Sequence, residues 1–392
     1  MTIAITILIA LLGVYLDYKA YRRVKSCSAG KFVKYAFLSV IGISYLLILV
    51  TPLLMYFFVG VENCGYMMKL SMILFTTYLT LSIPRLFFYF FFLPAKKKCW
   101  MWIGSAVSAF LLLAMLYSIF ITRTDYKINK VDICCDNLPV SFNNYRIAFI
   151  SDIHTGSMIC AERELMEIAE MVDDANVDVL FFGGDIINLY HHEIDDSLLD
   201  DFSRLKARDG VYMVFGNHDT GAYIKGLDKG GREANMELLE SKMESAGWVV
   251  LRDSTVYIER GKDSIAVTGI DYNDTLLKYK HSMDAVKGVD IAHIYNNVHG
   301  SLFNITLSHL PQLWHSLSDG GYSDLVLSGH VHAMQMKIGS FSPAGYMYKE
   351  WSGLYESENG KLYINDGIGC VGYLMRIGAR PEITVIELYS KK

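Results

Sequence analysis

Five short segments between residues 150 and 333 carry side chains that could bind divalent metal ions. In chain order they are Asp152-Ile153-His154, Gly183-Gly184-Asp185, Gly216-Asn217-His218-Asp219, His309 and Gly329-His330-Val331-His332. Carboxylates, imidazoles and amide oxygens suit borderline divalent metals such as Mn, Fe and Zn. Any one of these segments alone would be an ordinary turn or helix cap, but five in series provide enough ligands for two ions. The series therefore predicts a dinuclear metal site.

Two metal ions held about 3.5–4 Å apart can share a carboxylate, activate a hydroxide and clamp the attacking and leaving oxygens of a phosphoryl displacement. His218 is left over when the other side chains are used as ligands, and it stands beside Asp219. A histidine held by a carboxylate can donate a proton to a leaving alkoxide or bind a phosphate oxygen. We therefore expect phosphoester hydrolysis, with His218 and Asp219 as the catalytic residues.

Each of the five segments directly follows a short apolar run that reads as a strand, which is typical of an α/β domain. Helical spacing of apolar residues predicts a helix over Glu162–Ala175 and a second one around Met236–Met243. In open α/β sheets, ligands bind outside the carboxyl ends of the strands, so we expect the five segments to meet at one edge. The expected strands are Arg146–Ser151, Val177–Phe182, Val211–Phe215, Ile305–Ser308 and Asp324–Ser328.

This motif series resembles that of the calcineurin-like metallophosphoesterases. Residues 376–388 and the Gly367-Ile368-Gly369 turn before them resemble the C-terminal strand of the membrane-anchored bacterial YkuE/YaeI-like branch. In that branch the last motif usually continues as Gly-His-Thr-His-Gly-Gly-Gln. Here Ala333-Met334-Gln335 follow His332, so bulkier residues border the expected site.

The resemblance implies an αββα fold for residues 123–392, with two packed mixed sheets and helices outside. It also implies two divalent metal ions, with Mn expected and Fe or Zn as alternatives. Asp185 would bridge the two ions, and His218, oriented by Asp219, would act as the acid or phosphate-binding group. One ion would be held by Asp152, His154, Asp185 and His332, and the other by Asp185, Asn217, His309 and His330.

Residues 1–122 have the composition of a membrane region. They contain eleven Lys or Arg residues but only two acidic ones, Asp17 and Glu62. A helix needs about 20 apolar residues to cross a bilayer. Four apolar stretches predict four spans, near residues 2–16, 35–61, 69–94 and 99–122. The first could be read as a signal peptide, but it lacks a basic start and a small-residue cleavage site.

Positive charges indicate the orientation of these spans, because cytoplasmic loops are enriched in Lys and Arg. The basic loops follow the first and third spans, so we expect the N-terminus and the C-terminal domain to be extracytoplasmic. Arg85, after Pro84 in the third span, is interpreted as reaching the interface or binding a carbonyl freed by the proline. The alternative for Arg85 is an intramembrane functional site. The basic residues of the loops that follow the first and third spans are Lys19, Arg22, Arg23, Lys25, Lys31, Lys34, Lys96, Lys97 and Lys98.

Composition excludes several other classes of protein. Residues 123–392 hold 25 basic and 39 acidic residues, a formal charge of −14, which is a poor match to nucleic acid and disfavours a nuclease. Seven cysteines without a Cys-x-x-Cys motif exclude a zinc ribbon and a disulfide scaffold. The partners expected are instead a lipid bilayer and a phosphorylated small-molecule or lipid-linked substrate.

Two functions fit these observations. The first is a membrane-anchored dimetal phosphoesterase that hydrolyses a phosphodiester or pyrophosphate bond in an envelope or lipid-linked substrate, since a tethered site meets membrane substrates at high effective concentration. The alternative is a membrane sensor or transporter whose extracytoplasmic domain binds a phosphorylated ligand without hydrolysing it. Four spans exceed what an anchor requires, but every ligand position is filled, which favours the enzyme.

The remaining histidines have no motif context, and most are expected at the surface. They are His191, His192, His281, His293, His299 and His315.

Overall fold

The computed structural model describes residues 2–26, 30–58, 60–94, 97–296, 298 and 302–391. The chain divides into two compact units. One, the helical unit, consists of Met1–Phe58 and Leu70–Phe120, and the other, the α/β unit, consists of Val59–Lys69 and Ile121–Lys392. The short segment between the second and third long helices therefore packs with the α/β unit, although the chain on either side of it belongs to the helical unit.

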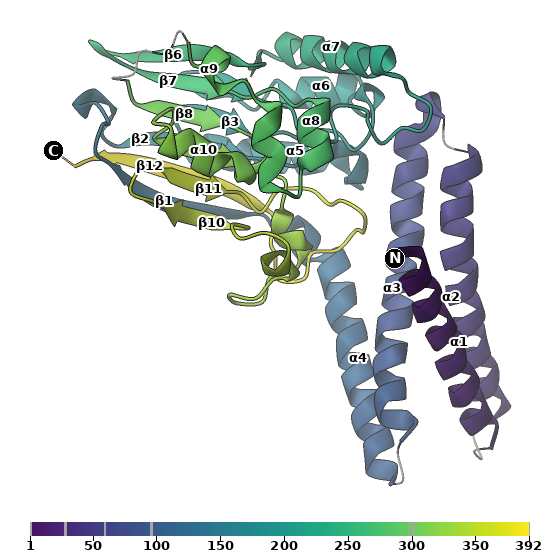
Figure 1. Cartoon of the computed structure of the whole chain (residues 1–392). Coiled ribbons are helices and arrows are strands. Elements are labelled where there is room, and N and C mark those ends of the chain that lie inside the picture. The colour runs from purple at the N-terminus through teal and green to yellow at the C-terminus, as the bar shows by residue number, and fades with distance from the viewer. Residues whose placement is uncertain are drawn as a thin grey trace. The chain divides into compact units, whose positions relative to one another are not determined.

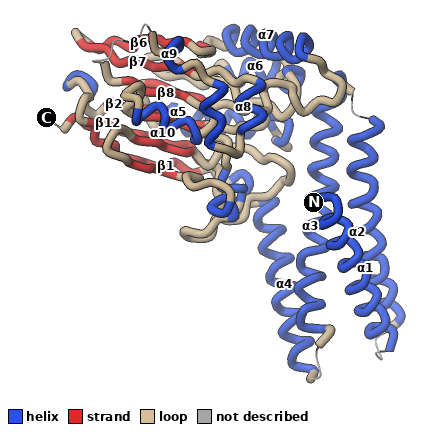
Figure 2. Tube along the Cα trace, in the orientation of Figure 1, coloured by secondary structure: helices blue, strands red, loops and turns tan. Residues whose placement is uncertain are grey.

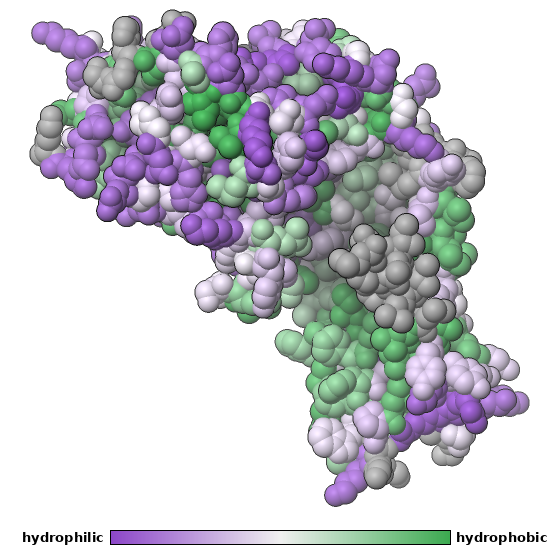
Figure 3. Space-filling model, viewed as in Figure 1, coloured by the Kyte–Doolittle hydropathy of each residue, from purple (hydrophilic) through white to green (hydrophobic). Residues whose placement is uncertain are grey.

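Four long helices make up the N-terminal region, and their exposed surface is largely hydrophobic (Figure 3). Within the described residues, three segments are long and apolar enough to cross a membrane: Lys31–Leu54, Val61–Phe92 and Cys99–Thr124. They overlap the second, third and fourth expected spans. The helices are α1 (Thr2–Ser26), α2 (Lys31–Phe58), α3 (Cys64–Phe92) and α4 (Lys98–Phe120) (Figure 1).

Arg85 pairs with an acidic side chain, not with the freed carbonyl or the interface that its sequence context suggests. Its Nε lies 3.5 Å from Asp17 Oδ1 of α1, and both side chains are about nine-tenths buried or more. The hydroxyls of Tyr45 and Tyr89 each donate to the Asp17 carboxylate at 2.7 Å. The sequence interpretation missed this pair because the two charges lie 68 positions apart, and no local pattern links them.

The α/β unit contains two six-stranded mixed sheets (Figure 2). The first has the order β1-β12-β2-β3-β4-β5, and the second β10-β11-β9-β8-β7-β6. β12 runs parallel to β1 and antiparallel to β2, while β2 to β5 are parallel. In the second sheet β7, β8, β9 and β11 are parallel, and the outer strands β6 and β10 are antiparallel to their neighbours.

The bounds of the first sheet's strands are β1 Lys127–Cys135, β2 Tyr145–Ile150, β3 Val179–Phe182, β4 Val211–Met213, β5 Val249–Val250 and β12 Glu382–Ser390. Those of the second are β6 Ser254–Arg260, β7 Asp263–Gly269, β8 Asn304–Leu307, β9 Leu325–Ser328, β10 Gly353–Glu356 and β11 Lys361–Ile364. The helices are α5 Ala161–Asp174, α6 Asp196–Phe202, α7 Lys229–Ser245, α8 Asp274–Tyr279, α9 Ile291–Ile294 and α10 Trp314–Asp319.

Alternation along the strands explains how the sheets and helices pack. Ile147 and Phe149 of β2 belong to one buried cluster with Val267 of β7 and Leu327 of β9, so the two sheets face each other across it. The alternate residues of β2 pack in a second cluster with Leu165 and other apolar residues of α5. Strands that are buried on both faces read as continuous apolar runs, which is why the sequence predicts them. The result is the expected αββα layering.

Candidate metal centre

The candidate ligands lie at the carboxyl ends of five strands. Asp152, Asp185 and Asn217 follow β2, β3 and β4 of the first sheet, and His309 and His330 follow β8 and β9 of the second. Within each sheet these strands run parallel, so their carboxyl ends share one edge. Both sheets thus deliver polar side chains to one site.

The first group of side chains surrounds a small, fully buried space. The ligand atoms of Asp152, His154, Asp185 and His332 all lie within 4.8 Å of one another. His332 Nε2 is 3.0 Å from Asp152 Oδ1, and His154 Nε2 is 3.7 Å from Asp185 Oδ2. The Nε2 atoms of His154 and His332 face each other at 3.3 Å. Four potential ligands therefore point at one position.

The second group shares Asp185 with the first. It brings together Asp185, His309 and His330 within the same 4.8 Å limit. His309 Nε2 lies 3.3 Å from Asp185 Oδ2 and 3.1 Å from Asn217 Oδ1. His309 Nδ1 donates to the Gly183 carbonyl at 2.8 Å, which fixes the ring with Nε2 directed at the Asp185 carboxylate. All seven expected ligand residues therefore meet, in two groups joined by one carboxylate.

This donor set fits divalent cations. Asp152 and Asp185 are buried, and in the described part of the chain no Lys or Arg pairs with either. Buried carboxylates need hydrogen-bonded partners or a metal ion, and convergent imidazole nitrogens and carboxylate oxygens are the ligands that Mn, Fe and Zn accept. The cluster is consistent with a dimetal site.

The electrostatics favour the metal-binding forms of several side chains. Burial lowers the pKa of His154 and His330 well below its ordinary value, and neighbouring histidines lower it further. Burial alone would raise the pKa of Asp185, but His309, His218 and His154 hold it well below its ordinary value. The imidazoles of His154 and His330 are therefore neutral and the Asp185 carboxylate is ionised.

Five of the seven ligand residues have left-handed backbone conformations. The φ angles of Asp152, His154, Asp185, His330 and His332 are 54°, 48°, 60°, 73° and 51°. Non-glycine residues rarely adopt this region, and each such residue costs on the order of 1–3 kcal/mol. Such residues cluster at the turns that aim the side chains into the site, as expected where the surrounding fold enforces a functional geometry.

Asp219 supports one of these strained turns. Its carboxylate accepts hydrogen bonds from the backbone N–H groups of Asp185, Ile186, Ile187 and Gly216, at 2.8 to 3.2 Å. A side chain could not replace the hydrogen at Gly216, since a Cβ there would lie 2.2 Å from Asp185 Oδ1. The Asp219 carboxylate therefore holds the turn at Asp185 by accepting from its backbone N–H groups.

The sequence predicts that Asp219 also orients His218, but another group takes that place. His218 Nδ1 donates to the backbone carbonyl of Asn188 at 2.7 Å. Burial lowers the pKa of His218, although Asp185 and the Asn188 carbonyl act against this shift. His218 also lines the cavity at the site, so its Nε2 remains the nitrogen available to a substrate.

That cavity has a volume of about 290 Å³ and is lined by both groups and by residues without a sequence motif. Tyr223 OH accepts a hydrogen bond from Asn217 Nδ2 at 2.8 Å and another from Lys280. His281 Nδ1 lies 2.6 Å from Tyr348 OH. Sequence reasoning missed these residues, because Lys280 and His281 lie in a loop far from any expected strand end.

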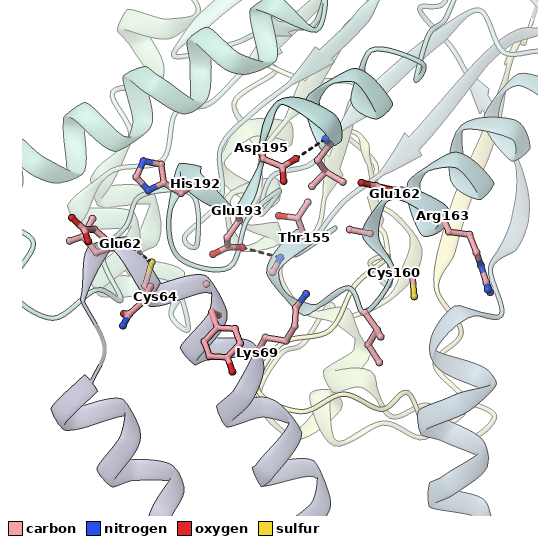
Figure 4. Close-up of a pocket in the computed structure, with 18 residues that line it drawn as sticks. Glu62, Cys64, Lys69, Thr155, Cys160, Glu162, Arg163, His192, Glu193 and Asp195 are labelled. Atoms are coloured by element: carbon pink, nitrogen blue, oxygen red, sulfur yellow. Dashed lines mark hydrogen bonds between the residues drawn. The ribbon is translucent and has the colours of Figure 1, made fainter.

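Glu193 is a further residue that sequence reasoning missed. Its buried carboxylate accepts from the backbone N–H groups of Gly156, Asn188, Leu189 and Tyr190. It thereby ties the turn after His154 to the loop that holds His218. Glu193 also lines a second cavity, of about 670 Å³, together with the segment Val61–Lys69 (Figure 4). A single glutamate in a loop gives no spacing signal that could have identified it.

The other histidines divide between surface and interior. His192 and His293 are exposed as expected, and His315 is half-buried. His281 is exposed as expected and also lines the cavity at the candidate metal centre, whereas His191 is buried. His299 lies outside the described residues.

Comparisons with known proteins point to metallophosphoesterases. The profile described as calcineurin-like phosphoesterase matches residues 145–334. The chain is 32% identical over 269 residues to a transmembrane protein with metallophosphoesterase domain from Danio rerio, covering 67% of this chain and 57% of that protein. It is 26% identical over 284 residues to the Bacillus subtilis metallophosphoesterase YkoQ, covering 70% and 94%. It is 27% identical over 272 residues to YkuE of the same organism, covering 64% and 82%. The matched part thus spans little more than half of the Danio rerio relative.

Proposed function

Residues 145–334 belong to the calcineurin-like phosphoesterase family, and from this premise we propose that the chain is a membrane-anchored dimetal hydrolase of phosphodiester or pyrophosphate bonds. The observation that carries the proposal is the sharing of Asp185 between two convergent ligand groups. A bridging carboxylate is the arrangement that holds two ions close enough to act on one phosphoryl group.

Each residue then has a defined task. Asp152, His154, Asp185 and His332 would hold one ion, and Asp185, Asn217, His309 and His330 the other. Bound there, Mn, or alternatively Fe or Zn, would supply a nucleophile at neutral pH and neutralise phosphoryl oxygen charge. His218 offers Nε2 to the substrate while Asn188 holds Nδ1. A bound phosphate anion favours the imidazolium form of His218, because an opposite charge raises the pKa of histidine, and this form can protonate the leaving oxygen.

The expected spans and their orientation are the reason for proposing an envelope or lipid-linked substrate. We place α1 as a fourth span, with the domains divided at residues 122 and 123. The pairing of Asp17 in α1 with Arg85 in α3 supports this, since a charge in a span is stable when another span provides its partner. The basic loops after the first and third spans support an extracytoplasmic α/β unit. The grouping of Val59–Lys69 with Ile121–Lys392 agrees, because it requires both segments on the same side.

The first experiment compares hydrolysis of bis-p-nitrophenyl phosphate with that of p-nitrophenyl phosphate, with Mn²⁺ added or chelated. We expect Mn²⁺-dependent turnover of the diester by the wild-type chain and loss of nearly all of it in Asp185→Asn. Asp263→Asn, at the exposed first residue of β7, is the matched control and should keep wild-type rates. Monoester turnover alone would contradict the diester preference. Ligand binding without any metal-dependent hydrolysis would favour the sensor alternative.

Orientation is tested separately from activity. A reporter fused after Lys392 that is active only outside the cytoplasm should give signal in intact cells. A cytoplasm-specific reporter at the same position should be silent. Signal from the cytoplasmic reporter would contradict the proposed orientation and leave the hydrolytic proposal intact.

A further inference from the structure

An exposed apolar surface borders the cavity of the metal centre. Its members, named here the apolar rim, are Ile338, Phe341, Tyr346 and Met347, whose exposed fractions are 60%, 47%, 84% and 55%. Exposed clusters of large apolar side chains mark contact sites for a partner or a membrane. Met347 also lines the cavity, so the rim is continuous with the candidate active site.

The rim is built on a tight hairpin. Ile338 and Phe341 pair through two backbone hydrogen bonds of 2.9 and 3.1 Å, and Gly339 between them has a φ of 61°. The ring of Phe341 lies 6.4 Å from that of Tyr346 in an edge-on arrangement. Two aromatic rings of the rim therefore lie close together, and Met347, the neighbour of Tyr346 in sequence, lines the cavity.

Hydrogen bonds join the start of the rim segment to residues 373–377 of the α/β unit. The Lys337 N–H donates to the Ile377 carbonyl at 2.9 Å, and the Ile377 N–H donates to the Gln335 carbonyl at 2.8 Å. The Tyr373 hydroxyl donates to the Met334 carbonyl at 2.8 Å. These bonds fix the N-terminal end of the segment that carries the apolar side chains.

The base of the hairpin lies beside the point where the chain enters the α/β unit. Ile377, which pairs with Lys337, stands three residues before Arg380, and Arg380 forms an ion pair with Asp125 at 2.8 Å. Asp125 directly follows the candidate span Cys99–Thr124. A residue advances the chain by at most about 3.6 Å, so the hairpin base is connected to the end of a candidate membrane span by contacts and a short piece of chain.

We propose that the apolar rim inserts into the bilayer interface and presents the metal centre to phosphoesters embedded in that membrane. The inference rests on the proposed hydrolytic function and names its substrate class: a phosphoester whose apolar part remains in the bilayer. Tyr346 is suited to the interface, where its ring lies among apolar groups and its hydroxyl contacts water, and Phe341 adds apolar surface beside it. The bilayer is the occupant because the adjoining chain continues into a span.

The test uses the full-length chain in lipid nanodiscs and three p-nitrophenyl phosphodiesters. Hexadecyl p-nitrophenyl phosphate resides in the bilayer, whereas butyl p-nitrophenyl phosphate and bis-p-nitrophenyl phosphate are soluble. The rim variant is Ile338→Ser with Phe341→Ser, neither of which lines the cavity. The matched control is Leu238→Ser with Tyr257→Ser, which removes apolar side chains of 48% and 43% exposure elsewhere in the unit.

We expect the rim variant to lose about tenfold or more in kcat/KM for the hexadecyl ester, the factor expected when large apolar side chains lose hydrocarbon contact. Its rates on both soluble esters should stay near wild type, and the control should match wild type on all three. Equal loss on the butyl and hexadecyl esters would overturn the proposal, because the rim would then bind the substrate's own chain. Unchanged hexadecyl hydrolysis would also overturn it.

A second readout does not depend on activity. Phe341→Trp in nanodiscs that contain brominated lipids should show added fluorescence quenching relative to wild type, whereas Leu238→Trp should not. Equal quenching of the two variants would overturn membrane insertion. If the wild-type chain hydrolyses none of the three esters, the phosphodiesterase part of the proposed function fails, and the quenching result still decides whether the rim meets the bilayer.

Discussion

His218 is oriented by a backbone carbonyl and not by a carboxylate. Because the Asn188 carbonyl can only accept, Nδ1 carries the proton in this contact, and Nε2 faces the cavity. A carbonyl fixes the ring without adding a full negative charge beside two buried carboxylates. The position of His218 therefore depends on the loop that Glu193 holds, which makes Glu193 a positioning residue.

Replacement of His218 should affect substrates according to their leaving group. We expect His218→Ala to lower kcat by about 10²–10⁴ for an alkyl diester, the usual contribution of general acid catalysis. The loss should be smaller for bis-p-nitrophenyl phosphate, whose leaving group needs no proton. Steady-state kinetics on both substrates, with bound metal quantified, check this. Equal losses on both would contradict the role as acid, and His192→Ala, at an exposed position, is the control.

His191 should make stability depend on pH. Burial, together with His192 and Lys242, lowers its pKa to about 4, whereas an unfolded histidine titrates near about 6.5. The unfolded state thus binds more protons between these values, so the stability of the fold is full above about pH 6.5 and falls as the pH drops towards 4. Thermal unfolding from pH 4 to 8 should show a weaker dependence in His191→Gln. The exposed His293→Gln should retain the wild-type dependence.

At the scale of elements, the sequence predicts most of the scaffold of the site. The apolar runs before Asp152 and Asp185 are buried on both faces, and that burial produces the pattern that identifies β2 and β3. The order of strands could not be predicted, because the insertion of β12 between β1 and β2 depends on contacts across the whole domain. Glu193 and Lys280 could not be predicted either, since their partners are brought near only by folding.

The Gly367–Gly369 turn of the C-terminal region has a steric reason for its composition. A Cβ at Gly369 would lie 1.9 Å from the Ile153 carbonyl oxygen, and the Gly369 N–H donates to the Asp152 carbonyl at 2.7 Å. The turn therefore closes against the segment that carries Asp152 and His154. The buried Arg376 guanidinium holds it there by donating to the Gly369 carbonyl.

Gly369→Ala should therefore destabilise the fold by about 1–3 kcal/mol, the usual cost of overpacking, and weaken metal binding by displacing Asp152. Chemical unfolding and metal titration are the measurements. Gly230→Ala, within α7, is the control, because a Cβ at Gly230 would lie 3.7 Å from the nearest neighbouring atom, which is an ordinary contact distance. Wild-type metal affinity in Gly369→Ala would contradict the link between this turn and the ligands.

At the scale of the whole molecule, a buried ion pair joins the first and third long helices. Removal of one member of such a pair leaves an uncompensated charge, and replacement of both by apolar residues is often neutral. The Asp17 carboxylate also accepts hydrogen bonds from the hydroxyls of Tyr45 and Tyr89. The cluster therefore specifies which faces of α1, α2 and α3 pack together.

Single variants Asp17→Leu and Arg85→Leu should each destabilise the helical unit by about 3 kcal/mol or more, whereas the double variant should be closer to wild type. Unfolding in mixed detergent micelles, followed by helical ellipticity, measures this double-mutant cycle. Additive losses would indicate that the two residues do not interact. Phosphodiester hydrolysis by the double variant should remain near wild type, since neither residue contacts the metal centre.

The first and last strands of the α/β unit pair in parallel, with Lys127 opposite Glu382 at one end and Cys135 opposite Ser390 at the other. Within the described residues, β12 is the link between β1 and the rest of its sheet, and it follows the other strands of that sheet along the chain. As the chain grows from the ribosome, every candidate metal ligand is made before β12 joins β1 to the sheet. A product that stops before β12 would therefore carry the candidate ligands without the complete sheet that holds them.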